Sequence, residues 1–160
     1  MNIFLKIFHF TIFSNILVSI CALCLSMSTQ IIIDYNNNYI NIFVFFSTLA
    51  SYNFQRIIRL RENLNHYRVK WMIQYKKIIY FFILSSTIIS FYCFINFNLK
   101  SQTSIVIASS IALLYPFGLR KIPFLKIFLI SFVWTIITSL ILFFEKNILI
   151  NQEEIIHLIS

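Results

Sequence analysis

Acidic side chains are scarce in this sequence of 160 residues, which contains five of them and a single aspartate, Asp34. Charged residues of both signs account for 11% of the chain, against about 25% in an average soluble protein. Because carboxylates are the protein ligands that hold hard cations such as Mg²⁺, this scarcity limits the metal chemistry that the chain can perform alone. Glycine occurs once and proline twice, and all three lie close together in the sequence.

Apolar residues are abundant: they make up 59% of the chain, which includes 19 phenylalanines, and the mean hydropathy is +0.84. A helix needs roughly 20 apolar residues to cross a hydrocarbon layer about 30 Å thick. Strands of a membrane barrel would alternate polar and apolar residues, which these runs do not. We therefore predict an all-α, polytopic membrane helical bundle, a single domain over residues 1–160 with about five transmembrane helices. The expected helices cover residues 7–33, 39–55, 78–97, 104–117 and 124–144.

The two ends of the chain each have an alternative interpretation. Lys6 precedes the first apolar run, as it would in a signal peptide, but the run is long and lacks an obvious small-residue cleavage site. A retained first helix is therefore favoured. The tail, residues 145–160, is rich in Ile and Leu and resembles the start of a further helix, so we expect the chain to be a truncated form of a longer bundle.

Basic residues are distributed unequally between the two expected sides of the membrane. With five crossings, eleven of the thirteen Lys and Arg residues fall on one side, and only Lys100 and Lys146 fall on the other. Loops rich in Lys and Arg stay in the cytoplasm. We therefore expect a protein of the bacterial cytoplasmic (inner) membrane with a cytoplasmic N-terminus. The eleven residues are Lys6, Arg56, Arg59, Arg61, Arg68, Lys70, Lys76, Lys77, Arg120, Lys121 and Lys126.

The basic cytoplasmic loop, residues 56–77, alternates Arg and Lys with apolar residues and also contains Trp71 and Tyr75. Cationic and aromatic residues at a membrane boundary are typical of an interfacial helix lying on anionic lipid headgroups. The same charges would also attract an anionic substrate such as a phosphate or a diphosphate. A nucleic-acid partner is not expected, because loops on the cytoplasmic side are basic by default.

The second cytoplasmic connection, residues 114–123, reads LYPFGLRKIP and holds both prolines and the glycine. Pro116 and Gly118 should end the fourth helix, and Pro123 suits the first turn of the fifth. The turn would present Arg120 and Lys121 at the membrane surface. Taken alone, the segment predicts a tight turn whose charges set the topology.

Amides and cysteines within the apolar runs have structural explanations. Asn15, Asn53, Gln55 and Asn96 lie in or near expected helices, where single amides usually join helices by hydrogen bonds and less often mark a functional cavity. Cys21 and Cys24 form a CxxC motif deep within the first run. A metal or redox site would need a second pair of ligands, which the run lacks. No metal site is predicted.

Residues 114–123 resemble the end of the fourth helix in the UbiA-type polyprenyl transferase superfamily, where Tyr-Pro is followed by a Lys-Arg pair. Tyr115, Pro116 and Arg120 match that pattern, while Leu119 stands at the Lys position. PFLKIFLISFVWT at residues 123–135 is similar to short UbiA-like proteins of the Bacteroidetes. TLASYNFQR at residues 48–56 is similar to the end of the second helix in the same group.

The resemblance implies a bundle of about nine helices around a central cavity, in which a prenyl chain is transferred from a prenyl diphosphate to an acceptor. Two aspartate-rich motifs of the family hold Mg²⁺ against the diphosphate. In this chain Asn53 is present, but Phe54, Ile57 and Arg61 stand where the first motif has aspartates. Mg²⁺ is thus implied only by the resemblance, no cofactor is identifiable in the chain itself, and neither catalytic nor metal-binding residues are expected.

Two interpretations remain open from the sequence. In one, the chain is a truncated or degenerate UbiA-like prenyltransferase homologue, catalytically incomplete, that represents the N-terminal half of the fold. Its remaining contacts with a prenyl diphosphate would be Asn53, Arg56, Tyr115, Arg120 and Lys121. In the other, it is a small non-enzymatic membrane accessory or lipid-interacting protein. In either case the expected partners are the bilayer, its anionic headgroups, and a further copy or another chain that completes the bundle.

Overall fold

The computed structural model describes residues 3–58, 67–114 and 125–146, and every regular element in them is a helix. This confirms the all-α fold class for the described part of the chain. The elements are α1 (Ile3–Phe13), α2 (Ile16–Ile33), α3 (Asn38–Ile58), α4 (Tyr67–Gln74), α5 (Lys76–Ile95), α6 (Leu99–Leu114), α7 (Leu125–Thr135), the π-helical segment η4 (Ile136–Leu140) and α8 (Ile141–Glu145).

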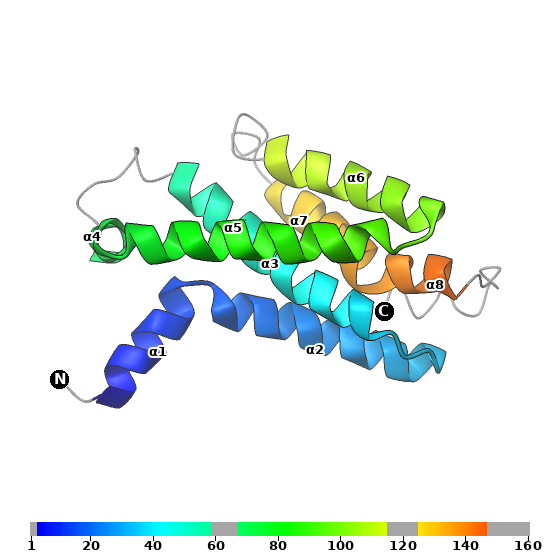
Figure 1. Cartoon of the computed structure of the whole chain (residues 1–160), viewed down its shortest axis with the longest axis horizontal. Helices are drawn as coiled ribbons and strands as arrows, with labels where there is room; N and C mark the ends of the chain where they lie inside the picture. The colour runs from blue at the N-terminus through cyan, green and yellow to red at the C-terminus, as the bar shows by residue number, and fades with distance from the viewer. Residues whose placement is uncertain (1–2, 59–66, 115–124, 147–160) are drawn as a thin grey trace.

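The long helices extend back and forth along the long axis of the molecule, so that successive ones are antiparallel (Figure 1). They are α2, α3, α5, α6 and the continuous stretch α7–η4–α8. Helix α3 packs against both α2 and α5 and also contacts α6. The shorter helices α1 and α4 lie at one end, where α1 inclines away from the bundle and α4 is seen nearly end-on (Figure 1).

Three of the described helical stretches are long and apolar enough to cross a membrane: Ile16–Ile33, Lys76–Ile95 and Ile127–Glu145. Helix α6 is apolar but has only 16 residues, and α3 has 21 residues but carries many polar side chains. The sequence prediction of a helical membrane protein is therefore supported by three spans. Whether α3 and α6 also cross the membrane, which would give five transmembrane helices, stays a prediction.

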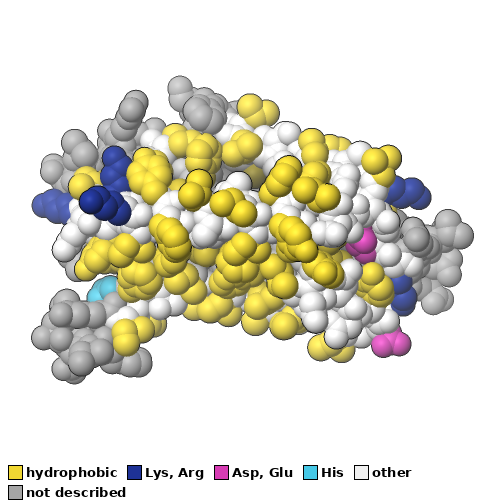
Figure 2. Space-filling model, viewed as in Figure 1, with side chains coloured by type: hydrophobic (Ala, Val, Ile, Leu, Met, Phe, Trp, Pro, Cys, Tyr) yellow, Lys and Arg dark blue, Asp and Glu magenta, His cyan; other side chains and the backbone are white. Residues whose placement is uncertain are grey.

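Side chains are arranged with their apolar groups outward and many of their polar groups inward. On α2 the buried residues are Ser19, Ala22, Ser26 and Gln30, whereas Leu25 and other large apolar residues of this helix are exposed. Figure 2 shows apolar side chains over the middle of the molecule and charged side chains near its two ends. Soluble proteins bury their large apolar residues instead. The arrangement fits a bundle surrounded by lipid, where small and polar residues join helices.

The first apolar run, expected as one helix over residues 7–33, is divided into α1 and α2. Asn15 lies at the division and has left-handed backbone angles, φ 64° and ψ 13°. Asparagine adopts this conformation more easily than other residues that have a Cβ. Two backbone carbonyls at the break, of Phe13 and Ser14, accept hydrogen bonds from side chains of α3. The sequence shows Asn15 but not these distant partners, so it does not reveal how the break is stabilised.

Helices α2 and α3 form a hairpin that is joined by amide side chains near both of its ends. Near the connecting turn, Gln30 and Asn41 exchange two hydrogen bonds of 3.0 and 3.2 Å, and Ser26 donates to the same Asn41 oxygen at 3.2 Å. Near the far end, the Asn15 amide donates to the Asn53 oxygen at 2.8 Å. These pairs satisfy most of their polar groups, which could not find water inside a membrane; the Asn15 side-chain oxygen has no partner among the described residues.

The segment expected as a basic loop over residues 56–77 is partly helical. Helix α3 extends to Ile58, α4 covers Tyr67–Gln74, and α5 begins at Lys76. The break between α4 and α5 lies at Tyr75, whose backbone has φ −101° and ψ 22°. Helix α4 therefore lies within the segment where an interfacial helix is predicted.

Candidate functional site

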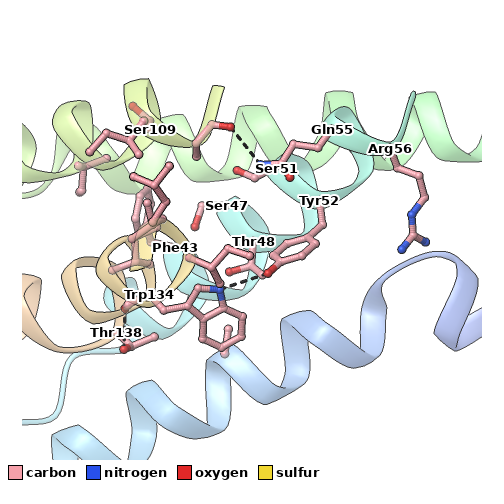
Figure 3. Close-up of a pocket in the computed structure, with 18 residues that line it drawn as sticks. Phe43, Ser47, Thr48, Ser51, Tyr52, Gln55, Arg56, Ser109, Trp134 and Thr138 are labelled. Carbon is pink, nitrogen blue, oxygen red and sulfur yellow. Dashed lines mark hydrogen bonds between the residues drawn. The ribbon is translucent and has the colours of Figure 1, made fainter. Parts of the chain in front are cut away.

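A cavity of about 350 Å³ lies between α3, α6 and the α7–η4 stretch, and Ala22 of α2 reaches it (Figure 3). This volume is in the range of small-ligand sites in proteins. Helix α3 contributes the polar side of the cavity. The other helices contribute most of its apolar wall. That wall includes Ile105, Ile111 and Ala112 of α6, Leu129, Ile130, Val133 and Trp134 of α7, and Ile137 of η4.

The polar side is built from two adjacent rows on α3. One row is Ser47, Ser51 and Gln55, and the other is Thr48, Tyr52 and Arg56. Residues four positions apart lie on the same face of an α-helix, so each row points in one direction. These rows explain why α3 is the least hydrophobic of the long helices: its polar groups face an internal space between helices instead of the lipid.

Two side-chain hydrogen bonds connect α3 to the opposite wall of the cavity. The Trp134 indole Nε1 donates to the Tyr52 hydroxyl at 3.2 Å, and the Gln55 Nε2 donates to the Ala112 carbonyl at 3.0 Å (Figure 3). The first bond joins residues 82 positions apart in the sequence. Both bonds hold the cavity walls at a fixed separation, which favours a preformed site.

Several hydroxyl groups line the cavity. Ser47 donates to the Val44 carbonyl at 3.3 Å and Thr138 to the Trp134 carbonyl at 2.8 Å. With respect to the residues that the structure describes, Thr48 and Ser51 form no side-chain hydrogen bond. A ligand with a hydroxyl, carbonyl or phosphate oxygen could bond to these two side chains at little cost, because no existing bond would be broken.

Arg56 lies at one end of the cavity, and its side chain is directed away from the other labelled side chains toward the α1–α2 break (Figure 3). Its Nη1 donates to the Phe13 carbonyl at 2.9 Å. The Arg56 side chain is half-buried. Arg56 therefore combines two positions: it borders the cavity and it stabilises the broken helix.

Asn53 is fully buried and does not border the cavity. Its oxygen accepts from Asn15 at 2.8 Å, and its amide nitrogen donates to the carbonyls of Ser14 and Leu49 at 2.9 and 3.0 Å. In this structure Asn53 is thus a structural residue beside the site. The remaining predicted contacts, Tyr115, Arg120 and Lys121, lie outside the described residues.

Among the residues that the structure describes, no carboxylate and no histidine lines the cavity. Elsewhere in the described part of the chain, no three His, Cys, Asp or Glu side chains are close enough to hold a metal ion. Cys21 and Cys24 are exposed on α2, and neither borders the cavity. The lining offers hydroxyl and amide groups, one guanidinium and a large apolar wall. It can bind an amphipathic molecule by hydrogen bonds and apolar contact.

Arg56 was named from the sequence as a candidate contact, and this residue borders the cavity, but none of the lining residues Ser47, Thr48, Ser51, Tyr52, Trp134 and Thr138 was named as a candidate. The four-residue spacing of polar residues along α3 was the available signal, since such rows indicate one polar face. No signal in the sequence connects Trp134 to Tyr52, because the contact depends on how distant helices pack. The π-helical η4, which supplies Thr138, is a type of segment often found at functional sites.

Comparison of the chain with protein-family models, with curated proteins and with solved structures gives no match.

Proposed function

We propose that this chain is an integral membrane protein that binds a prenyl lipid in the cavity and is a degenerate homologue of UbiA-type prenyltransferases. The apolar wall would take the hydrocarbon chain. The hydroxyls of Thr48 and Ser51 would bond to the oxygen-containing head, and Arg56 would provide positive charge at one end of the cavity. A lipid could enter from the surrounding bilayer without passing through water.

The position of the resembling segments supports this proposal. Residues 48–56 supply the polar side of the cavity through Thr48, Ser51, Tyr52, Gln55 and Arg56. Residues 123–135 supply part of the opposite wall through Leu129, Ile130, Val133 and Trp134. The two stretches quoted for the resemblance lie far apart in the sequence, yet both border the same space.

Binding without transfer is the form of the proposal that the lining favours. Phe54 and Ile57, which stand at aspartate positions of the family motif, do not border the cavity. Prenyl transfer from a diphosphate requires stabilisation of the leaving group, which carboxylate-held Mg²⁺ and cationic side chains would provide. Arg120 and Lys121 are proposed to contribute positive charge at the cytoplasmic surface, and Tyr115 is proposed as an uncharged contact to the diphosphate. Mg²⁺ would have no carboxylate ligand among the described residues of the cavity lining.

The second interpretation, a non-enzymatic membrane accessory protein, shares this binding role and differs in its partner. A further copy or another chain would then complete the bundle. The mass of the assembly extracted from its native membrane separates the two. A single chain of 19.1 kDa with bound lipid supports a self-contained binder, whereas a complex with a second polypeptide supports the accessory role.

Binding can be tested with two neighbouring serines of α6. Ser109 borders the cavity and Ser110 does not, although both are exposed and both donate to the Val106 carbonyl, at 3.0 and 2.7 Å. Ser109→Phe would fill part of the cavity, while Ser110→Phe places the same ring outside it. We expect at least about a tenfold loss of affinity for geranylgeranyl diphosphate in Ser109→Phe, because the ring competes with the chain for the same volume.

The measurement is equilibrium binding of labelled geranylgeranyl diphosphate to reconstituted protein, with and without Mg²⁺. Unchanged binding on addition of Mg²⁺ is expected, because the described lining residues include no carboxylate. Equal affinities for the two phenylalanine variants would overturn the assignment of the cavity. Binding that requires Mg²⁺, or release of diphosphate, would show that catalytic residues have been missed.

A further inference from the structure

We propose that α4 and the start of α5 form a binding surface for anionic phospholipid headgroups, built from Lys70, Lys76 and Lys77 beside Trp71 and Tyr80. This surface is separate from the cavity, and the proposal does not depend on the cavity having a ligand. The expected occupant is the bilayer leaflet at this end of the molecule.

The charges of the two ends of the molecule differ in a way that favours this surface. At the α4–α5 end the exposed lysines have no described acidic residue near them, and none of the three forms an ion pair with a described residue. At the opposite end, Lys100 and Lys146 are accompanied by Asp34 and Glu145. Figure 2 shows the same contrast, with acidic side chains at one end only. Only the α4–α5 end therefore has an uncompensated positive charge among its described side chains.

The aromatic residues fix the depth of these lysines. Trp71 packs edge-on against Phe10 and Phe13 of α1, with ring centroids 5.7 and 5.4 Å apart, and lies 4.8 Å from Tyr75. Tyr80 is nearly half exposed, one turn along α5 from Lys76. Trp and Tyr are the residues that gather where hydrocarbon meets water. The cluster thus places the boundary of the hydrocarbon layer at this level of the molecule.

The ammonium group of Lys76 lies 5.6 Å from the centre of the Tyr80 ring. Attraction between a cation and the ring face holds Lys76 along the helix surface, between the aromatic level and the water. Lipid phosphates occupy this same level. Each Lys near an anionic membrane surface multiplies the binding constant for that surface by about five.

The orientation of α4 provides an independent argument. This helix lies across the long axis of the bundle (Figure 1), exposing Lys70 and Ile73 while burying Met72. A short helix that lies across the bundle at its end runs along the membrane surface and not through it. Lys70 and Ile73 are three positions apart and share the exposed face of α4, where the lysine would reach the headgroups beside the apolar isoleucine.

Trp71 provides a direct probe for the test. The chain has two tryptophans, so a Trp134→Phe background leaves Trp71 as the single tryptophan whose fluorescence is measured. The protein is reconstituted in phosphatidylcholine vesicles that contain equal mole fractions of either brominated phosphatidylglycerol or brominated phosphatidylcholine. Stronger quenching by the phosphatidylglycerol is expected. The preference should fall about fivefold for each lysine changed to glutamine, and it should be smallest in the Lys70→Gln, Lys76→Gln, Lys77→Gln triple variant.

Lys100→Gln is the matched control, because it removes the same charge from the opposite end and should leave the quenching of Trp71 unchanged. Raising the ionic strength from about 0.1 to about 1 M should also reduce the preference. Equal quenching by the two lipids in the starting protein would overturn the proposal, as would a preference that is undiminished in the triple variant. If the triple variant fails to reconstitute, the three single variants supply the same comparison.

Discussion

Asn53 makes three hydrogen bonds, and two of them reach residues 38 and 39 positions earlier in the chain. One partner is the Asn15 amide and the other is the Ser14 carbonyl, both at the break between α1 and α2. At the residue scale, this single amide therefore satisfies polar groups that the broken helix leaves without partners of its own. An apolar residue of the same size could not replace it, since no water is available there.

Asn53→Leu should lower the free energy of unfolding by about 1–2 kcal/mol, because it leaves the Ser14 carbonyl and the Asn15 amide without partners. The value can be measured by unfolding in mixed micelles with increasing sodium dodecyl sulfate. Asn96→Leu is the matched control, since Asn96 is exposed and donates only to the Tyr92 carbonyl of its own helix. Equal losses in the two variants would contradict the structural role of Asn53.

Single amides illustrate what the sequence can and cannot predict. Helix-to-helix hydrogen bonding was the favoured explanation for Asn15 and Asn53, and the structure confirms it for this pair. The sequence did not identify which amides are paired. Asn96 has a similar sequence setting but bonds within its own helix. Pairing depends on how α2 and α3 align, which composition does not determine.

At the element scale, the residues at the two ends of a helix determine where it begins and ends. Helix α2 begins after Asn15 and ends at Asp34, and both residues have positive φ, 64° and 52°. Asp34 is exposed, and its backbone N–H donates to carbonyls of the last turn of α2. Because a left-handed conformation costs residues with a Cβ more than glycine, Asp34 is a position where the chain could be made more stable.

Asp34→Gly should raise the free energy of unfolding by about 0.5–1 kcal/mol, and Asp34→Val should lower it by about 1 kcal/mol or more. The reason is that glycine accepts this conformation and a β-branched residue resists it. Thermal unfolding in detergent, monitored by circular dichroism, measures both changes. A stabilising effect of valine would show that α2 does not end in the left-handed conformation.

Apolar runs predicted the positions of the helices well, and their boundaries less well. Residues 78–97 correspond to α5 at Lys76–Ile95, and residues 104–117 correspond to α6, which begins five residues earlier at Leu99. A helix was expected within the basic segment, and α4 lies there, but its bounds, Tyr67–Gln74, were not predicted. Long apolar runs indicate helical backbone, because inside a membrane the backbone polar groups must bond to one another. Starts and breaks depend on local partners, which a run does not show.

At the scale of the whole molecule, charge separates the two ends and predicts how the protein lies in the membrane. Among the described residues, the α4–α5 end carries Lys70, Lys76 and Lys77, and the opposite end carries two basic and two acidic side chains. If the positive-inside tendency decides the orientation, the α4–α5 end faces the cytoplasm. The five long helical stretches would then alternate in direction across the bilayer.

Cysteine labelling tests this orientation. In a background where Cys21, Cys24 and Cys93 are changed to alanine, Lys100→Cys should react with a membrane-impermeant maleimide in intact cells. Lys77→Cys should react only after the cells are permeabilised, because the basic end is predicted to face the cytoplasm. The measurement is the fraction of each variant that carries the maleimide on a gel, before and after the cells are permeabilised. Reaction of Lys77→Cys in intact cells would reverse the proposed orientation.

The paired amides at both ends of the α2–α3 hairpin also restrict how this hairpin can assemble. Gln30 meets Asn41 near the turn, and Asn15 meets Asn53 near the far end. Sliding one helix past the other by a single turn, about 5.4 Å, would separate both pairs at once and leave their polar groups unbonded in lipid. A hairpin in which α2 and α3 are shifted by one turn is therefore high in free energy and should not accumulate as an intermediate. Since N-terminal segments emerge first during synthesis, this pair can settle in its final alignment and serve as a template for the helices that follow.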